Sequence, residues 1–134
     1  MSFDSVRSAL ATKVNNLLTA FDPTIRSQFE NQESVDMNVT TPWVEIEIHL
    51  IQAKQSSLET TPRTRYEGEL QTRIYIKAGS GTKRAFEISE ALARGLEYGR
   101  FGTANMRAPR PLPGRNVGDW YCIPLMTSFY TDTN

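Results

Sequence analysis

The sequence has little of the material from which disulfides, metal sites and nucleophilic active sites are built. Its 134 residues include a single cysteine, Cys122, and a single histidine, His49. One cysteine excludes an intrachain disulfide and favours a reducing cytoplasm. A metal site needs several ligands that converge at a suitable spacing, and these two residues form no such motif. We therefore expect neither a metal nor another bound cofactor.

Long apolar runs and an excess of charge are also absent. No segment approaches the roughly 18 apolar residues that cross a bilayer, and the N-terminal stretch MSFDSVRSALATKV lacks the apolar centre of a signal peptide. Lys and Arg total 15 and Asp and Glu total 15, so the formal net charge is zero. Phosphate binding needs a surplus of cations, which argues against a nucleic-acid-binding protein but leaves room for a local basic patch. We expect a chain that neither enters a membrane nor recognises a nucleic-acid sequence.

Two segments have the apolar spacing of amphipathic helices. Between residues 3 and 18, apolar side chains recur at steps of three and four, and Asp22-Pro23 provides a stop because the residue before proline avoids helical angles. The second segment, residues 85–96, follows a glycine-rich turn, and Gly99 is expected to close its helix. Both patterns predict helices with one apolar face that packs on a sheet.

Three longer segments alternate in the manner of half-buried strands. Residues 43–50 and 66–76 each place apolar side chains on one face and mainly charged or polar ones on the other. The polar stretch 52–65 between them predicts an antiparallel pair whose arms extend beyond the core. The last alternating segment is 119–130, and Pro124 places this strand at an edge of the sheet or at a bulge, since proline cannot donate a ladder hydrogen bond.

Together these elements predict one α+β domain over residues 1–134, in the order helix, strand, strand, helix, strand, strand. The economical arrangement is a two-layer sandwich, with a mainly antiparallel sheet of about four strands and both helices on one face. A short strand over residues 104–108 precedes a proline-rich turn, and residues 24–41 are a connector with at most a short helical or extended piece at 25–29. The polar tail 131–134 is expected to be loose.

No set of residues has the pattern of a catalytic site. Glu45, Glu47 and His49 alternate along one strand face, where three ligands fan out in a row instead of converging. Cys122 stands inside a strand next to Trp120, a position typical of a small packing residue. The stretch GSGTKR lacks the spacing of a phosphate-binding loop. We expect no catalytic residues and therefore a protein that is not an enzyme.

An ordered set of weak motifs does run along most of the chain. An N-terminal helix ends in LLTAF, and the strand PWVEIEI and the strand and turn YEGELQTRIYIKAGSGT follow it. The helix ALARGLEYG and the closing strand GRNVGDWYCIPLMTSFY complete the set. In this layout the chain resembles the tail terminator, or tail completion, proteins of long-tailed bacteriophages and prophages. Other small phage neck and head–tail joining proteins share much of the layout, so they form the alternative.

The resemblance implies a structural virion protein that works as a ring. Such proteins assemble as hexamers at the head-proximal end of the tail tube, stop its polymerisation and present a docking surface for the head. The implied partners are further copies of the chain, the tail tube protein and head–tail connector proteins, and DNA passes through the ring. The implied location is the tail or neck of a virion assembled in the host cytoplasm. No catalytic residue, metal or cofactor is carried over, and a small enzyme or nucleic-acid-binding factor is the least favoured alternative.

The candidate interface residues are charged side chains on the strand faces and in two of the connections. Unlike charges on such faces suit pairing between subunits, and a contact repeated by rotation closes a ring. We interpret residues 52–65 and 109–118 as docking segments, with ordinary surface loops as the alternative for each. The candidates are Glu45, Glu47, Lys54, Arg63, Arg65, Glu67, Glu69, Arg73, Arg110 and Arg115.

Overall fold

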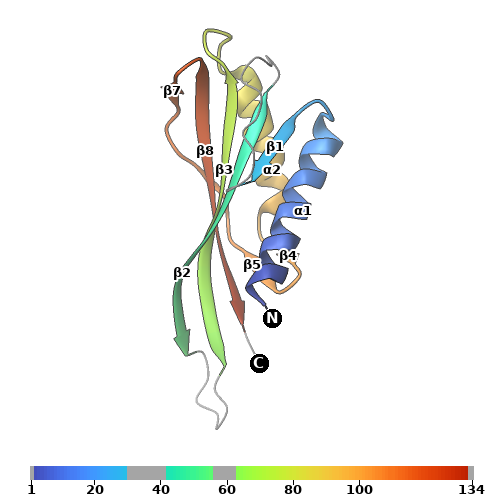
Figure 1. The fold of residues 1–134 in the computed structure, drawn as a ribbon, viewed down its shortest axis with the longest axis vertical. Coiled ribbons are helices and arrows are strands. Elements are labelled where there is room, and N and C mark those ends of the chain that lie inside the picture. The colour runs from blue at the N-terminus through green and yellow to red at the C-terminus, as the bar shows by residue number, and fades with distance from the viewer. Residues whose placement is uncertain (1, 30–41, 56–62, 133–134) are drawn as a thin grey trace.

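The computed structural model describes residues 2–29, 42–55 and 63–132, which form two helices and one curled sheet of eight strands (Figure 1). The helices are α1 (Phe3–Phe21) and α2 (Lys83–Leu96). The strands are β1 (Arg26–Phe29), β2 (Trp43–Gln55), β3 (Thr64–Lys77), β4 (Arg100–Phe101), β5 (Ala104–Met106), β6 (Arg110–Pro111), β7 (Arg115–Val117) and β8 (Trp120–Asp132). Their order across the sheet is β1-β2-β3-β8-β5-β4, and β6 and β7 also pair with β8.

Helix α1 begins and ends where the sequence predicts. Ser2 caps its N-terminus, because the Ser2 hydroxyl accepts a hydrogen bond of 3.0 Å from the Ser5 amide. At the other end the amide of Asp22 donates to the Leu18 carbonyl at 2.8 Å, and Pro23 prevents a further turn. The buried stripe consists of Val6, Leu10, Ala11, Val14 and Leu18. Its spacing is the one expected for a helix that packs on a sheet.

Helix α2 forms as predicted but ends differently. Its last residue is Leu96, and Tyr98, not Gly99, takes the left-handed conformation after it, with φ of 53°. Gly95 lies inside the helix because α1 comes so close there. A Cβ at residue 95 would lie 2.3 Å from Cδ2 of Leu17 on α1. The glycine therefore allows the two helices to pack side by side.

The long strands pair as an antiparallel ladder. β2 and β3 form the predicted antiparallel pair, from Trp43 opposite Tyr75 to Gln55 opposite Thr64, and the pair projects beyond the helices (Figure 1). A bulge between Leu50 and Gln52 shifts the register by one residue. Because side chains alternate along a strand, this shift moves Gln52 and the residues that follow it to the other face.

The sheet has more strands than the predicted four. β1 lies parallel to β2, and it is the extended piece that the sequence left open near residues 25–29. β5 is the short strand that the sequence predicts near residue 104, whereas β4, β6 and β7 were not predicted. The proline-rich segment 109–118 is thus more than a turn, because β6 and β7 within it pair with β8. The expectation of a four-stranded sandwich is therefore corrected to a curled, eight-stranded sheet.

The two predictions for the last strand are wrong. β8 lies inside the sheet, with β3 on one side and β5, β6 and β7 on the other, and its register with β3 is continuous through Pro124. Pro124 fits because the ladder on its outer side is interrupted there, between β6 and β7, and its carbonyl still accepts a hydrogen bond from Leu112 at 2.9 Å. Thr131 and Asp132 continue β8, and Thr131 is fully buried. The other two residues of the predicted tail, 133–134, lie outside the described residues.

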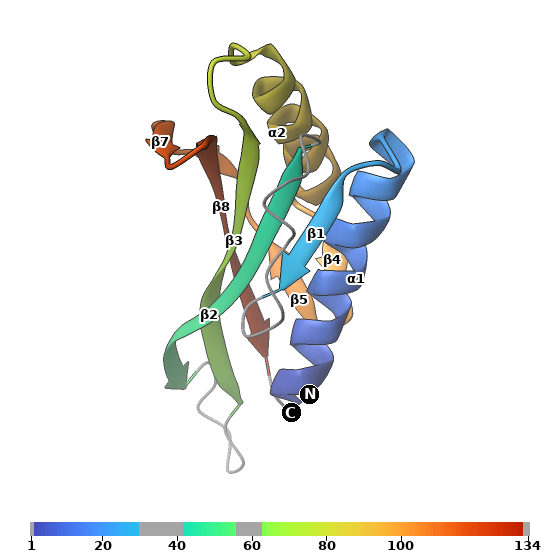
Figure 2. The same ribbon diagram turned by 45° about the horizontal axis from the view of Figure 1, so that its top comes forward.

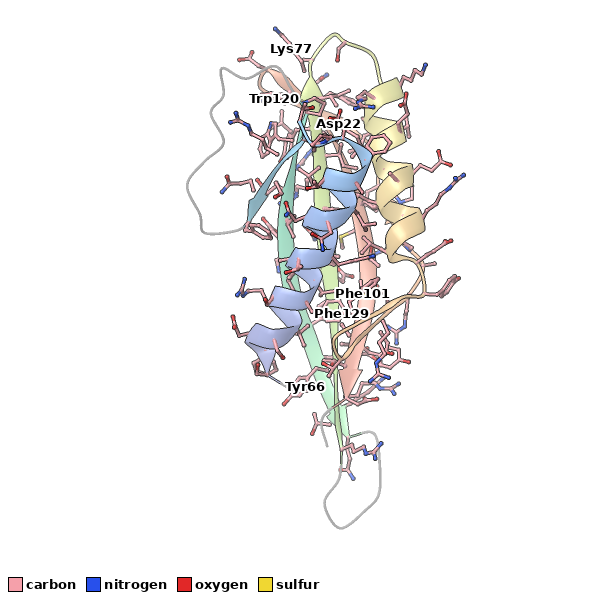
Figure 3. All side chains as sticks on the ribbon, turned by 90° about the vertical axis from the view of Figure 1, so that its right-hand side faces the viewer. Asp22, Tyr66, Lys77, Phe101, Trp120 and Phe129 are labelled. Carbon is pink, nitrogen blue, oxygen red and sulfur yellow. The ribbon has the colours of Figure 1, made fainter. Side chains whose placement is uncertain are left out.

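Both helices cover the same face of the sheet, as predicted, and they leave the other face open (Figure 2). The core lies between the helices and the inner faces of β2, β3 and β8. Its largest fully buried side chain, Phe129, packs over Gly68, where a Cβ would lie 2.7 Å from Cζ of the ring. Figure 3 shows Phe129 partway along the sheet, with Lys77 and Trp120 toward one end and Tyr66 toward the other.

Candidate assembly interface

The face of the sheet that carries no helix, called the open face below, displays most of the charged residues singled out in the sequence. Its strands are β2, β3 and β8, with β6 and β7 at the outer side of β8. Alternation along the paired strands assigns its side chains. They include Trp43, Glu45, Glu47, Lys54, Arg65, Glu67, Glu69, Arg73, Tyr75, Arg110, Arg115, Cys122, Tyr130 and Asp132.

One end of the open face is apolar. The rings of Trp43 and Tyr75 stack with their centroids 4.1 Å apart, and Trp120 meets Trp43 edge to face at 5.9 Å. Cys122 is fully buried beside them, and this burial raises the pKa of its thiol. Burial likewise raises the pKa of the Tyr75 hydroxyl. Both groups therefore stay neutral at pH 7 and act here as packing groups.

The middle of the open face holds an ion cluster centred on Arg73. Its Nη1 donates to Glu45 Oε1 at 2.5 Å and to Glu47 Oε1 at 2.7 Å, and its Nη2 donates to Glu47 Oε2 at 3.2 Å. His49 Nε2 lies 3.0 Å from Glu47 Oε2. These contacts raise the pKa of Arg73, with the hydrogen bond to Glu47 as the largest cause. One guanidinium thus holds two carboxylates that would otherwise repel each other.

Beyond the bulge a second cluster forms around Glu67. Its carboxylate lies 3.0 Å from Lys54 Nζ and accepts a 3.1 Å hydrogen bond from Gln52 Nε2. Arg107 approaches the same carboxylate at 3.8 Å. The hydrogen bond from Lys54 is the largest cause that lowers the pKa of Glu67. Lys54 reaches this partner because the bulge has turned it onto the open face.

The far end of the open face is built around Tyr130. Arg65 donates two hydrogen bonds to Asp132, from Nε to Oδ1 at 2.8 Å and from Nη2 to Oδ2 at 3.0 Å. This contact lowers the pKa of Asp132. The guanidinium carbons of Arg65 and Arg107 lie 4.2 and 5.1 Å from the centroid of the Tyr130 ring. A polar pocket of about 350 Å³ opens here. It is lined by Arg63, Arg65, Arg100, Thr103, Asn105, Tyr130 and Asp132.

The structure sorts the predicted interface residues into these groups. Glu45, Glu47 and Arg73 come together, as do Lys54 and Glu67. Arg63 and Arg65 line the polar pocket. Glu69 lies on the open face opposite Ser128. Arg110 and Arg115 are set apart from the β2 carboxylates, on β6 and β7.

Sequence reasoning missed several residues of this surface. Asp132 was assigned to a loose tail, although it continues the two-residue alternation of β8. Tyr130 and Arg100 were also missed, and Arg100 lies in a strand of two residues that has no periodicity to detect. Residues 56–62 of the predicted docking segment 52–65 lie outside the described residues.

A separate apolar groove of about 320 Å³ lies between the start of α1 and β2. Phe3, Val6, Ile48 and Leu50 line it together with Asp4 and Arg7. Phe3 is 54% exposed, and its ring meets Tyr66 edge to face at 5.1 Å. The helix pattern predicted Phe3 to face the core, so its exposure is a correction. It arises because Phe3 stands in the first turn, at the end of the helix layer.

Metal-binding and membrane-spanning features were the two remaining classes that the sequence argued against. Across residues 2–29, 42–55 and 63–132, no three His, Cys, Asp or Glu side chains gather as metal ligands would. Neither described helix is long and apolar enough to cross a membrane.

The Arg73 cluster predicts a pH dependence for Glu47→Gln. The pKa of Glu47 lies below its ordinary value of 4.5, and the hydrogen bond from Arg73 is the largest cause of this shift. A lowered folded-state pKa contributes stability above the unfolded-state value, and this stability is lost as pH falls through the folded-state pKa. We expect Glu47→Gln to unfold at a lower urea concentration than the wild type at pH 7, and we expect this difference to close as the pH falls below 4.5 and through the lowered pKa of Glu47.

Urea titrations at several pH values test this expectation. Glu97→Gln is the matched control, because Glu97 is exposed and makes no ion pair among the described residues. It should follow the wild type at every pH. A gap for Glu47→Gln that stays constant down to pH 3 would contradict the assignment of this pKa shift to Arg73.

Comparison with known proteins finds the fold but no family. No family model and no curated protein matches the chain. One solved structure, whose description names no function, superposes with a TM-score of 0.75 at 14% identity and covers 100% of this chain and 97% of its own. Another chain comes from the virion of a native gene transfer agent particle, with a TM-score of 0.58 and 16% identity over 98% of this chain and 100% of that chain. At these identities the likeness establishes a shared fold alone.

Proposed function

We propose that this chain is a structural subunit of a phage-type virion and that it works by assembling with other subunits. The observation that carries the proposal is the shared fold with a chain from the virion of a gene transfer agent particle. That likeness extends over nearly the whole length of both chains, so it involves the complete arrangement of helices and sheet instead of a small common motif.

Within that class, we propose the role of a tail terminator. The chain would form a hexameric ring on the head-proximal end of the tail tube, end its polymerisation and offer a docking surface to the head–tail connector. The motifs that carry the resemblance support this role, because residues 43–48 of PWVEIEI lie on β2 and YEGELQTRIYIK lies on β3, and these strands build the open face. The proposed location is accordingly the tail or neck of the virion.

The chemistry of the open face supports a structural role over a catalytic one. Four of its carboxylates are held by cations, through the contacts of Glu45 and Glu47 with Arg73, of Glu67 with Lys54 and of Asp132 with Arg65. A general acid or base at neutral pH needs a pKa near 7, whereas the pKa values of Glu47 and Asp132 are lowered. Such fixed, mixed charges suit the recognition of another protein surface.

Light scattering on the purified chain over a concentration series tests the ring. We expect a discrete hexamer whose population grows with concentration, because an assembly surface must bury itself against further copies. Electron microscopy of tail tubes mixed with the protein then tests its position. Rings confined to one end of each tube are expected for a terminator.

Two outcomes would redirect the proposal. Rings that bind connector proteins but leave tube ends free would favour the alternative, another neck or head–tail joining protein. A chain that stays monomeric alone and does not bind tube ends would count against an assembly role altogether.

A further inference from the structure

The register of four strands builds the polar pocket at the far end of the open face. Arg65 on β3 pairs with Asp132 on β8. Tyr130 on β8 pairs with Asn105 on β5, which in turn pairs with Arg100 on β4. Directly paired residues share a face of the sheet, and so do residues two positions apart on one strand. The register therefore brings side chains from three separate parts of the chain together at one end of the molecule (Figure 1).

The lining of this pocket contains more positive than negative charge. Three arginines, Arg63, Arg65 and Arg100, surround one carboxylate, that of Asp132. The hydrogen bond from Arg65 lowers the pKa of Asp132 most, and the charge of Arg63 adds to this shift. Arg100 is exposed and forms no ion pair with any acidic side chain of the described residues. Its guanidinium is therefore a cation that can bind a ligand in the pocket.

The pocket is held in shape by its own chain. The guanidinium carbon of Arg65 lies 4.2 Å from the centroid of the Tyr130 ring, so the ring supports this side chain. The turn between β4 and β5 is anchored as well, because the fully buried Thr131 donates a 2.8 Å hydrogen bond to the Thr103 hydroxyl in that turn. This contact holds the hairpin that carries Arg100. A site that is already in place loses less conformational freedom when a ligand binds.

The chemistry of the lining favours a small anion. Apart from the Tyr130 ring, the lining side chains are charged or polar, so an apolar ligand would gain little there. The volume of about 350 Å³ lies at the lower end of the roughly 300–1,000 Å³ of ligand pockets, which fits one small group. Planar guanidinium groups present paired N–H donors that match the oxygens of a carboxylate or a phosphate.

The surroundings favour a carboxylate over a phosphate. The pocket already holds one carboxylate, because Arg65 donates two hydrogen bonds to Asp132, and Arg100 can offer the same geometry to a second one. A phosphate monoester carries about two negative charges at pH 7. It would be repelled by Asp132 inside the pocket and by Glu67, which lies beside Tyr130 in the sheet. The continuous negative charge of a nucleic acid would meet both carboxylates as well.

The source that fits best is a protein other than a further copy of this chain. Four carboxylates of the open face are held by cations of their own subunit, namely Glu45, Glu47, Glu67 and Asp132. A further copy is therefore poorly equipped to supply a carboxylate from this surface. Arginine and tyrosine, which line the pocket, are enriched at the centres of interfaces between proteins.

We propose that this pocket binds an acidic side chain of the protein on which the subunit docks and that Arg100 receives its carboxylate. The inference rests on the proposed function for the docked protein, which is the tail tube protein or a head–tail connector protein. The affinity of the pocket for a carboxylate does not depend on that function, so the two can be tested separately.

Titration of the purified chain with sodium acetate tests the pocket, with chloride keeping the ionic strength constant. Nuclear magnetic resonance of the arginine Nε–H groups shows which side chain responds, and we expect a saturable shift at Arg100. Arg100→Gln should weaken acetate binding at least about 10-fold. Asp132→Asn removes the carboxylate that competes inside the pocket, so it should tighten acetate binding at least about 3-fold.

Arg26→Gln is the matched control for Arg100→Gln. Arg26 is also exposed and has no acidic partner among the described residues, but it lies on β1 and does not line the pocket. Its substitution should leave the acetate affinity within about 2-fold of the wild type. Circular dichroism and thermal melting first show that all the variants fold.

Docking experiments then test the source of the carboxylate. Arg100→Gln should form rings like the wild type, because a further copy does not supply the carboxylate. It should bind tail-tube ends or connector proteins at least about 10-fold more weakly than the wild type and Arg26→Gln do.

The outcomes separate this inference from the proposed function. Unchanged acetate binding by Arg100→Gln would overturn the carboxylate site, and so would inorganic phosphate that binds at least about 10-fold tighter than acetate. An acetate site combined with undiminished docking of Arg100→Gln to tubes and connectors would overturn the docked protein as the source and assign the pocket to a free carboxylate. A wild type that docks on neither would overturn the proposed function and this source with it, whereas the acetate titration still decides whether the pocket binds a carboxylate.

Discussion

Arg73→Met is expected to lower the free energy of unfolding by about 2–3 kcal/mol at pH 7. This loss is smaller than the loss expected when a fully buried ion pair loses one partner. Methionine keeps much of the length of the side chain but removes the cation that lies between Glu45 and Glu47. The two carboxylates would then face each other with side chains that are only 26% and 23% exposed. Water screens such partly buried charges poorly, so losing one partner costs more than the pair itself contributes.

Two control variants separate this mechanism from a general loss of charge. Arg94→Met breaks the contact with Glu90 on the surface of α2, where the two side chains are 77% and 61% exposed. An exposed helix pair contributes no more than about 0.5 kcal/mol. The triple variant Arg73→Met, Glu45→Gln and Glu47→Gln removes both charge signs, and it should recover most of the stability that Arg73→Met loses.

Urea denaturation of these variants at pH 7 tests whether the charges of the cluster cause the loss of stability. An equal loss for Arg94→Met and Arg73→Met would contradict the special role of the cluster. A triple variant no more stable than Arg73→Met would show that the lost stability came from packing instead of charge. The cluster also has a consequence for assembly, because side chains already held in place lose less conformational freedom when a partner docks.

The elements with strong periodicity were predictable from the sequence. The stripe of α1 and the alternation along β2, β3 and β8 repeat over enough residues to distinguish helix from strand. β4, β6 and β7 have only two or three residues each, so no period can be read from them. β6 and β7 form because β8 offers hydrogen-bonding groups on its outer side, and β4 forms because β5 does the same. These groups are a property of the assembled sheet.

The interface was predictable only as a set of residues, not as a set of contacts. Alternation alone places Glu45 and Glu47 on one face, and likewise Glu67 and Arg73. Which charge meets which depends on the register between β2 and β3, and the bulge after Leu50 changes that register. No local pattern in the sequence predicts this bulge. The bulge brings Lys54 close to Glu67, so this contact could not be predicted either.

The apolar end of the open face shows how a correct alternation can be misinterpreted. Trp43 stands two residues before Glu45, and Tyr75 two residues after Arg73, so both follow the face of the charged residues. Alternation therefore predicts that Trp43 and Tyr75 lie on the open face. The charged residues between them nevertheless led to the prediction that this face is polar along its whole length. Trp120 comes from a distant segment, and its contact with Trp43 exists only because β3 lies between β2 and β8.

Phe129→Ala is expected to lower the free energy of unfolding by about 3–5 kcal/mol. Phe129 is fully buried on β8, between Gly68 on β3 and Met106 on β5. Gly68 has no side chain that could fill the cavity, and a Cβ there would also lie 2.4 Å from the His49 carbonyl oxygen. The loss therefore combines the missing apolar contact with a cavity that the backbone cannot close.

Phe86→Ala is the matched control for this prediction. Phe86 lies on α2 and is 55% exposed, so the same substitution there removes little buried surface. Thermal and urea unfolding should show a change within about 0.5 kcal/mol for Phe86→Ala. Equal losses for the two variants would mean that Phe129 does not anchor the core.

Phe129 also connects the core to the open face, which extends the prediction to assembly. On the core side it packs where β5 pairs with β8, and the neighbouring Tyr130 on the open face lies under Arg65 and Arg107. A cavity at Phe129 is expected to loosen this pairing and to displace Arg65 and Arg107 on the open face, which we propose as an assembly surface. Phe129→Ala should therefore lower both stability and assembly. Loss of assembly without loss of stability in Phe129→Ala would contradict this link.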